Sequence, residues 1–203
     1  YKDFPELTIR DMVRAHRLLA DILGIHRIHT LVGSSVGGFQ AVEWAVQEPE
    51  RIGKLVLIAT AAKASPWSIS YRGPEGYDLS QQDESDDFSS HRACTYQQYQ
   101  GEKLCRRYNA YSYYKILNAF DTHDVGYQRG GVAAALQRIT AECLVVGIST
   151  DIIFTVPEMQ ALHRMLPRST YHQIDSPFGH DGFLVEHEQL NRILNPFIHP
   201  THE

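Results

Sequence analysis

One short stretch of the chain holds the side chains with the clearest chemical potential. Residues 29–45 read HTLVGSSVGGFQAVEWA, with two serines and three glycines between an apolar run and a helix-like run. A turn of this composition either cradles a phosphate group or presents one serine for chemistry. The residue types around the turn decide between these uses.

Phosphate-binding motifs fit this stretch poorly. A P-loop needs a lysine after its glycines, but here Phe39 and Gln40 follow them. A dinucleotide-binding loop needs glycine where Ser35 stands, and it needs an acidic residue at the end of the next strand, where the sequence LIAT has none. The nucleotide interpretations are therefore weak.

The pattern GxSxG of a nucleophile elbow does match, from Gly33 to Gly37. In such a tight turn, a side chain two residues before or after the serine is expected to collide with neighbouring backbone. The turn places Ser35 above the sheet at a helix N-terminus, where the N–H of Val36 can face a developing oxyanion. The competing interpretation is a Gly- and Ser-rich turn without chemistry.

Two later residues supply the partners that a serine nucleophile needs. Serine attacks only when a base takes its proton, and a carboxylate must orient that base. Asp151 follows the apolar run CLVVGI, and His180 follows the next strand-like run, TYHQID. The order Ser, Asp, His is that of α/β-hydrolase triads. The sequence therefore predicts a triad of Ser35, Asp151 and His180.

Composition excludes several classes of partner. The chain has 203 residues, 43% of them hydrophobic, and a net charge of −5 without a basic footprint for nucleic acid or an anionic membrane. No apolar run reaches the ~20 residues of a membrane-spanning helix, and the first residues lack the apolar core of a signal peptide. We expect neither a nucleic acid nor a membrane as partner.

The cysteines and histidines indicate neither a disulfide framework nor a metal site. Cys94, Cys105 and Cys143 are an odd number, widely spaced and without a CxxC pair. The eleven histidines are scattered and lack the spacing of HExxH. A reducing cytoplasm fits this composition best, and no metal is expected.

The elements around the motif alternate between helix and strand. Apolar spacing predicts an amphipathic helix over 8–24, with Thr8 and Asp11 as a capping box and Gly24 as its stop. Apolar runs at 25–33 and 54–60 predict strands covered on both faces, and the stretch between them reads as a helix ended by Pro49. This order predicts a parallel sheet with crossover helices.

The middle of the chain departs from that alternation. No strand-like run occurs from residue 61 to about 120, so we expect a helical lid inserted into an α/β core. The acidic stretch at 78–90 is expected to be a solvated loop, and the tyrosine-rich stretch at 96–120 a helix whose rings line a cleft or pack on the core. Strand, helix, strand and a final helix then return. The predicted organisation is core 1–68, inserted segment 69–120 and core 121–203.

Longer stretches carry a more specific signal than GxSxG. TIRDMVRAHRLLADILGI, the stretch from GSSVGGFQAVEWA to AAKASP, RRYNAYSYYKILNAFDTHDVG and GHDGFLVEH resemble the homoserine O-acyltransferase family of the α/β-hydrolase fold, chiefly its acetyltransferases. The likeness covers nearly the whole chain. It implies an α/β-hydrolase fold with a mostly parallel sheet and a helical lid.

The resemblance also implies an activity. Ser35, with His180 as base and Asp151 orienting it, would take an acetyl group from acetyl-CoA and pass it to the γ-hydroxyl of L-homoserine, in methionine biosynthesis. No bound cofactor is implied, since acetyl-CoA is a substrate, and a homodimer formed through lid helices is expected. By the same likeness Asp181 would bind the substrate amino group, although a helix N-cap is an equal alternative.

The chain also departs from the family. Only 34 residues precede Ser35, whereas the family has further strands and a second oxyanion donor there, and an unpaired elbow strand would be an exposed edge. We therefore expect the sequence to be incomplete. No position matches the arginine that binds the substrate carboxylate in the family, so that role is not given to Arg72 or to any other arginine. Succinyl transfer, serine as acceptor, ester hydrolysis and an inactive remnant remain the alternatives.

Overall fold

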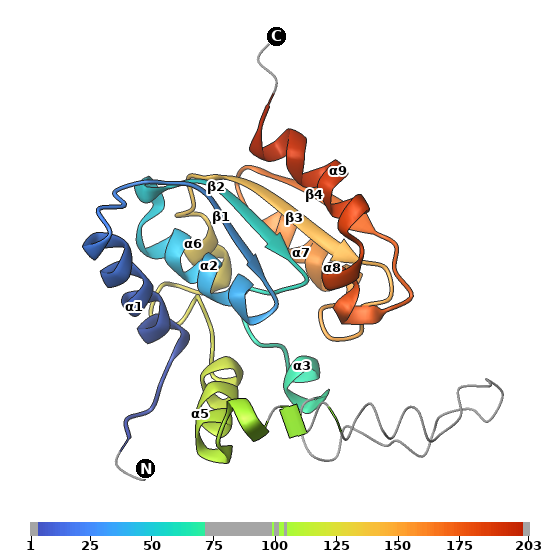
Figure 1. Ribbon diagram of the computed structural model, residues 1–203. Coiled ribbons are helices and arrows are strands. Elements are labelled where there is room, and N and C mark those ends of the chain that lie inside the picture. The colour runs from blue at the N-terminus through green and yellow to red at the C-terminus, as the bar shows by residue number, and fades with distance from the viewer. Residues whose placement is uncertain (1–3, 72–98, 100–101, 104, 201–203) are drawn as a thin grey trace, which may run out of the picture.

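A parallel sheet forms the centre of the molecule, as the alternation predicted. The computed structural model describes residues 4–71, 99, 102–103 and 105–200. Its four strands pair in the order β1-β2-β3-β4, and every neighbouring pair is parallel (Figure 1). The strands are β1 (Ile28–Ser34), β2 (Ile52–Ile58), β3 (Glu142–Ile148) and β4 (Ser169–Ile174).

The helices begin and end close to where caps and breakers place them. In the first helix the Thr8 side chain accepts from Asp11 N, and the Asp11 carboxylate accepts from Thr8 N, which confirms the predicted capping box. The described helices are α1 (Ile9–Ile22), α2 (Val36–Gln47), α3 (Pro66–Tyr71), α5 (Ala110–Asp121), α6 (Val132–Leu136), α7 (Val156–Met165), α8 (Gly182–Val185) and α9 (His187–Ile198), with short 3-10 turns at Pro49–Arg51 and Gly179–Asp181.

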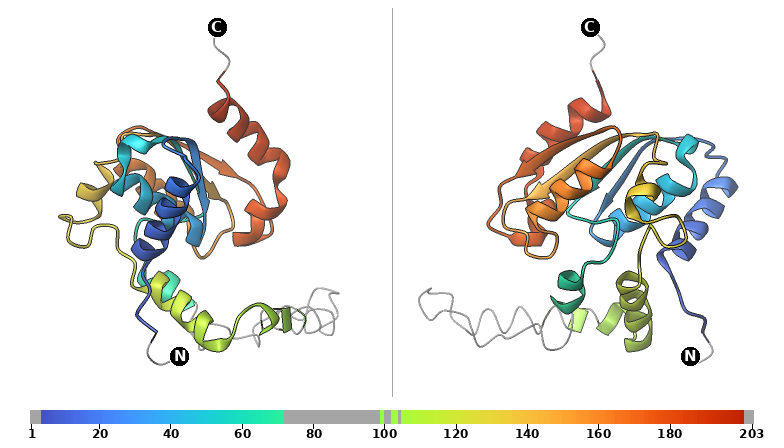
Figure 2. Two further views of the ribbon diagram at one scale, coloured as in Figure 1. Left: turned by 60° about the vertical axis from the view of Figure 1, so that its left-hand side comes forward. Right: turned by 180° about the vertical axis from the view of Figure 1, so that it is seen from behind.

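Helices cover the two faces of the sheet unequally. Alternate residues of β2 divide between two apolar clusters: Leu55 and Leu57 pack with residues of α1, α2, α6 and α7, whereas Val56 and Ile58 face α9. Figure 2 shows α9 on the opposite side of the sheet from α2 and α7. An uninterrupted apolar run is therefore explained by burial on both faces, as predicted for β2 and also seen in β3.

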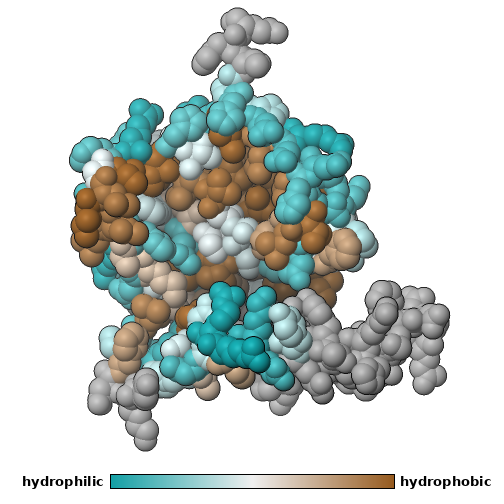
Figure 3. All heavy atoms as spheres, viewed as in Figure 1, coloured by the Kyte–Doolittle hydropathy of each residue, from teal (hydrophilic) through white to brown (hydrophobic). Residues whose placement is uncertain are grey.

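The prediction of two-sided burial is wrong for β1. Among the described residues β1 is an edge strand, and Val32 is 50% exposed. The helix α2 packs on one face of β1, while α9 contacts the far end of the sheet at β4. Hydrophobic residues are consequently exposed on this face of the sheet. Figure 3 shows them in the same view in which Figure 1 shows β1 and β2.

The helices α3 and α5, at the two ends of the inserted segment, lie beyond the carboxyl ends of the strands (Figures 1 and 2). The chain just before the inserted segment, residues 62–64, pairs with the chain just after it, residues 123–125. We call this pairing the clasp and its two stretches of chain the roots of the segment. Within the clasp Lys63 and Asp124 form an antiparallel bridge and an ion pair of 2.9 Å. The segment therefore leaves and rejoins the core at one place. The acidic stretch 78–90, Arg72 and Cys94 lie outside the described residues.

Candidate active site

The strand β1 ends in the predicted elbow, and Ser35 has a backbone conformation rare for an L-residue, with φ 50° and ψ −127°. A Cβ on Gly33 would overlap the carbonyl oxygen of Gly37, which agrees with the expected steric demand. For Gly37 the expectation is wrong, since a Cβ there has no described atom within 4 Å. The tight position that the sequence analysis missed is Gly38, whose Cβ would overlap the buried side chain of Thr60.

The elbow is fixed to the neighbouring strand by hydrogen bonds. Ser35 N donates to the carbonyl oxygens of Ile58 and Ala59, both at 3.1 Å. Thr60 Oγ1 donates to Ser35 O at 2.7 Å, so the side chain that crowds Gly38 also holds the serine backbone. The strained turn is therefore anchored to the end of β2.

The structure brings together the three residues that the sequence predicted as a triad. Ser35 Oγ and His180 Nε2 are 2.9 Å apart, and His180 Nδ1 and Asp151 Oδ2 are 2.8 Å apart. The other carboxylate oxygen of Asp151 accepts from Ile153 N at 2.8 Å and Phe154 N at 3.1 Å. The Asp151 side chain is fully buried, so these donors stabilise its charge without help from water.

Aromatic packing limits the movement of the His180 ring. The ring centroid of Phe154 lies 5.5 Å from that of His180, and that of Phe183 lies 5.4 Å away. The side chain of His180 retains 18% exposure. An imidazole flanked by two aromatic rings, bonded to a carboxylate and facing a serine hydroxyl can accept a proton from that hydroxyl.

The other two predicted site residues lie close in the chain to the triad. Val36 is the first residue of α2, so its N–H has no intrahelical acceptor and belongs to the set that binds anions at helix N-termini. Asp181 is exposed and precedes α8, without a side-chain hydrogen bond to that helix. The N-cap alternative thus lacks the bond that would define it.

Sequence reasoning missed a buried polar group behind the elbow. Glu43 on α2 is fully buried and bonded by Arg129, and His123 is 6% exposed. Burial lowers the pKa of His123 to about 4. Burial would raise the pKa of Glu43, but hydrogen bonds from Arg129 and Gln47 and the charges of Arg129 and Arg10 outweigh it and lower that pKa. Arg10 and Glu43 are 33 residues apart in the sequence, so their spacing carries no local signal.

The described part of the chain offers little for a metal or a reactive thiol. No group of three or more His, Cys, Asp or Glu residues there could hold a metal ion. Cys105 and Cys143 are free, and burial raises the pKa of the Cys143 thiol to about 12. No helix among the described residues has the length and apolar character needed to cross a bilayer.

Comparison with known proteins places the chain in a family. The profile of the alpha/beta hydrolase fold matches residues 2–187. A homoserine O-acetyltransferase of Cyclobacterium marinum is 35% identical over 97% of this chain and 67% of its own length. The chain belongs to the homoserine O-acetyltransferase family. This confirms the resemblance and the α/β-hydrolase fold.

Other members of the homoserine O-acetyltransferase family and related folds agree. The enzyme of Thermus thermophilus is 37% identical over 97% of this chain, which spans 60% of that relative's length. The crystal structure of homoserine O-acetyltransferase from Staphylococcus aureus superposes with a TM-score of 0.82 at 25% identity, covering 100% of this chain and 68% of that one. An acetylester hydrolase of Corynebacterium glutamicum superposes with a TM-score of 0.66 at 25% identity, covering 88% and 62%.

Proposed function

We propose that the protein transfers an acetyl group from acetyl-CoA to the γ-hydroxyl of L-homoserine, a step of methionine biosynthesis, through an acetyl-Ser35 intermediate. The observation that carries the proposal is the continuous chain of hydrogen bonds from Ser35 through His180 to Asp151 in a member of this family. The identity of the substrates is inferred from relatives that are named homoserine O-acetyltransferase.

The first half of the reaction loads the serine. His180 Nε2 takes the Ser35 hydroxyl proton while Oγ attacks the thioester carbonyl, and the Asp151 carboxylate stabilises the imidazolium that forms. The tetrahedral oxyanion faces the N–H of Val36. Collapse breaks the C–S bond, and His180 returns the proton to the leaving thiolate, which yields CoA and acetyl-Ser35.

The second half repeats these steps with a different nucleophile. His180 takes the proton of the homoserine γ-hydroxyl, whose oxygen attacks the acetyl-Ser35 carbonyl. Breaking the Ser35 Oγ–acyl bond gives O-acetylhomoserine, and the proton returns to Ser35. Asp181, one residue after His180 and exposed, can pair with the ammonium group of homoserine.

Hydrolysis is the rival that the comparisons favour most, because an acetylester hydrolase shares the fold at 25% identity. Water would then replace homoserine in the second half. The succinyl and serine alternatives differ from the main proposal only in the groups that contact the donor and the acceptor.

The test is product analysis with purified protein. Acetyl-CoA and L-homoserine are expected to give O-acetylhomoserine, and acetyl-CoA alone is expected to add one acetyl group at Ser35, detected by peptide mass spectrometry. Ser35→Ala should abolish both signals, because no other hydroxyl faces His180 Nε2 among the described residues.

Donor and acceptor panels separate the alternatives. Acetate release that does not fall when homoserine is added would favour a hydrolase, and faster turnover with succinyl-CoA or with serine would reassign the substrates. Ser35→Ala with undiminished transfer would sink the mechanism itself.

Two further expectations depend on this assignment. A homodimer in the cytoplasm is proposed from the family resemblance, and sedimentation velocity of the purified protein measures the oligomeric state. A monomer at micromolar concentration would contradict the dimer.

A further inference from the structure

The carboxylate of Glu43 lies on the helix that begins at the elbow, and it is surrounded by donors. Arg129 donates from Nη1 to Oε2 at 2.8 Å and from Nη2 to Oε1 at 2.6 Å. Gln47 Nε2 donates to Oε1 at 2.7 Å, and Arg10 Nε lies 3.3 Å from the same oxygen. A buried carboxylate is costly unless it is paired in this way, so its position depends closely on its partners.

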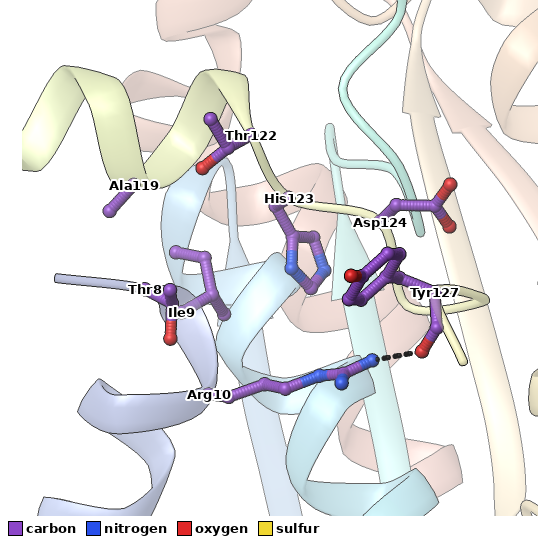
Figure 4. Close-up of a pocket in the computed structure, with 8 residues that line it drawn as sticks. All are labelled: Thr8, Ile9, Arg10, Ala119, Thr122, His123, Asp124 and Tyr127. Atoms are coloured by element: carbon purple, nitrogen blue, oxygen red, sulfur yellow. Dashed lines mark hydrogen bonds between the residues drawn. The ribbon is translucent and has the colours of Figure 1, made fainter. Parts of the chain in front are cut away.

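Both arginines also bind the backbone of the return loop, residues 123–129, which follows the inserted segment. Arg129 Nη1 donates to Val125 O at 2.9 Å, and Arg10 Nη2 donates to Tyr127 O at 2.7 Å (Figure 4). Glu43 therefore connects α2 to this loop through two separate cations, one of which comes from α1.

The return loop forms one half of the clasp at the roots of the inserted segment. Ala64 N donates to His123 O, and Val125 N donates to Ala62 O, both at 3.1 Å. A shift of the return loop would therefore move both roots. Near the start of the inserted segment, the indole N–H of Trp67 donates to Ile152 O, next to Asp151.

Aromatic contacts continue from the return loop toward the base of the triad. The ring centroid of His123 lies 5.0 Å from that of Phe39 on α2, and the centroid of Phe39 lies 6.0 Å from that of Phe154. Phe154 in turn contacts His180. The loop thus contacts the same helix that presents Ser35 and, through two rings, the general base.

Packing alone does not hold the return loop. A cavity of about 270 Å³ lies between the start of α1, the end of α5 and this loop, and Figure 4 shows the side chains that line it. His123 lines the cavity, and its buried Nε2 has no hydrogen-bond partner among the described residues. With open space on this side, the loop is held from its other sides by the arginines bonded to Glu43, by the clasp and by the contact of His123 with Phe39.

We propose that Glu43 is a positioning residue: through Arg129 and Arg10 it fixes the return loop, and with it the adjoining helices α3 and α5, relative to Ser35. The helices α3 and α5 lie beyond the carboxyl ends of the strands (Figure 1), the edge at which β1 leads into Ser35. Substrate groups that contact α3 or α5 are thereby held at a set distance from the acyl-serine. The inference uses the proposed acyl transfer only for its choice of substrates.

Arg129→Met and Glu43→Gln test the proposal through three measurements. The KM values for acetyl-CoA and L-homoserine are expected to rise about tenfold, because both substrates must reach beyond the triad. Ser35 acylation by 4-nitrophenyl acetate, an ester too small to need the inserted segment, should change less than about threefold. Hydrogen exchange at the amides of Ala64 and Val125 should accelerate about tenfold or more.

Matched variants separate positioning from general loss of stability. Arg192→Met removes an exposed pair with Glu188 of 3.3 Å and should leave all three measurements unchanged. Arg129→Lys keeps the charge without the two-nitrogen contact, so its KM values should lie between those of the wild type and Arg129→Met. The double variant Glu43→Gln/Arg129→Met removes both buried charges and should recover thermal stability while KM stays high.

Unchanged KM values and unchanged amide exchange in folded Arg129→Met would overturn the proposal. So would a fall in ester acylation that matches the fall in transfer, since this would indicate damage to the triad itself. If the wild-type protein does not acetylate homoserine, only the proposed function fails, because the ester and exchange measurements still test Glu43.

Discussion

At the scale of single residues, the site combines strain with firm anchoring. Ser35 holds a positive φ that costs about 1–3 kcal/mol for a residue with a Cβ. Two acceptors, Ile58 O at the end of β2 and Ala59 O after it, and one donor from Thr60 retain it there. The carboxylate of Asp151, the proposed third member of the triad, is likewise fixed by two backbone N–H groups. Main-chain groups thus take part in orienting both Ser35 and Asp151.

His123 gives the stability of the protein a dependence on pH. Its pKa is about 4 when folded and near 6.5 when exposed, because burial disfavours the charged ring. The unfolded state therefore binds the proton more readily, and stability falls as the pH drops from about 6.5 to 4. The full loss is about 3 kcal/mol, and the contribution is complete above pH 6.5.

His123→Phe isolates this contribution, since a phenyl ring can still stack on Phe39. The free energy of unfolding, measured in urea at pH 7.0 and pH 4.5, should fall less in the variant than in the wild type. The measured quantity is the difference between the two proteins, because other histidines and carboxylates titrate equally in both. An identical pH dependence would show that His123 does not titrate on unfolding.

At the scale of elements, the start of α2 is set by how closely it approaches β2. Gly38 lies against Thr60 without room for a Cβ, while Gly37 faces open space. These neighbouring glycines look equivalent in the sequence. Only Gly38 allows α2, the helix that follows Ser35, to pack closely against Thr60.

Substitution by alanine should separate the two glycines. Gly38→Ala must push α2 away from Thr60, which bonds Ser35 O, and is expected to cost about 1–3 kcal/mol together with much of the acylation rate. Gly37→Ala should be neutral or stabilising by up to about 1 kcal/mol, because alanine favours a helix over glycine. Thermal unfolding and Ser35 acylation by 4-nitrophenyl acetate measure both effects. A Gly37→Ala variant as unstable as Gly38→Ala would contradict this account.

Local patterns predicted the elements well and the distant contacts poorly. Short-range spacing predicts the capping box of α1 and the strands β2 and β3. It also predicts that Asp151 and His180 follow neighbouring strands. The exposure of β1 depends on which helices cover the sheet, and the Glu43 cluster joins residues from three separate segments. Neither the exposure of β1 nor the contacts of Glu43 produce a regular spacing of residue types that could be recognised in the sequence.

At the scale of the whole molecule, α9 supplies most of the helical side chains that cover the second face of the sheet among the described residues. The smaller apolar cluster joins residues of β2, β3 and β4 and Ala59 to Leu190 of α9, with Phe183 of α8 and Ile193, Leu194 and Phe197 of α9 packed against them. Lys54 on β2 also donates to Phe197 O near the end of α9. The opposite face, by contrast, is covered by several helices.

Loss of this contact should therefore be costly. Leu190→Ala is expected to lower the free energy of unfolding by about 2–4 kcal/mol, because Leu190 is 7% exposed and its removal leaves a cavity. Leu18→Ala, at a position 64% exposed, should change it by less than about 0.5 kcal/mol. Urea unfolding monitored by circular dichroism compares the two. Equal losses would mean that α9 contributes little to the second face.

The clasp has a consequence for engineering. Residues 64 and 123 are adjacent in space because Ala64 N bonds His123 O, although 58 residues separate them in the chain. The entropy of closing a loop between fixed ends grows slowly with its length. The chain between these ends can therefore be exchanged as a unit: a chimera with the corresponding segment of a relative between residues 64 and 123 should keep the contacts among Ser35, His180 and Asp151.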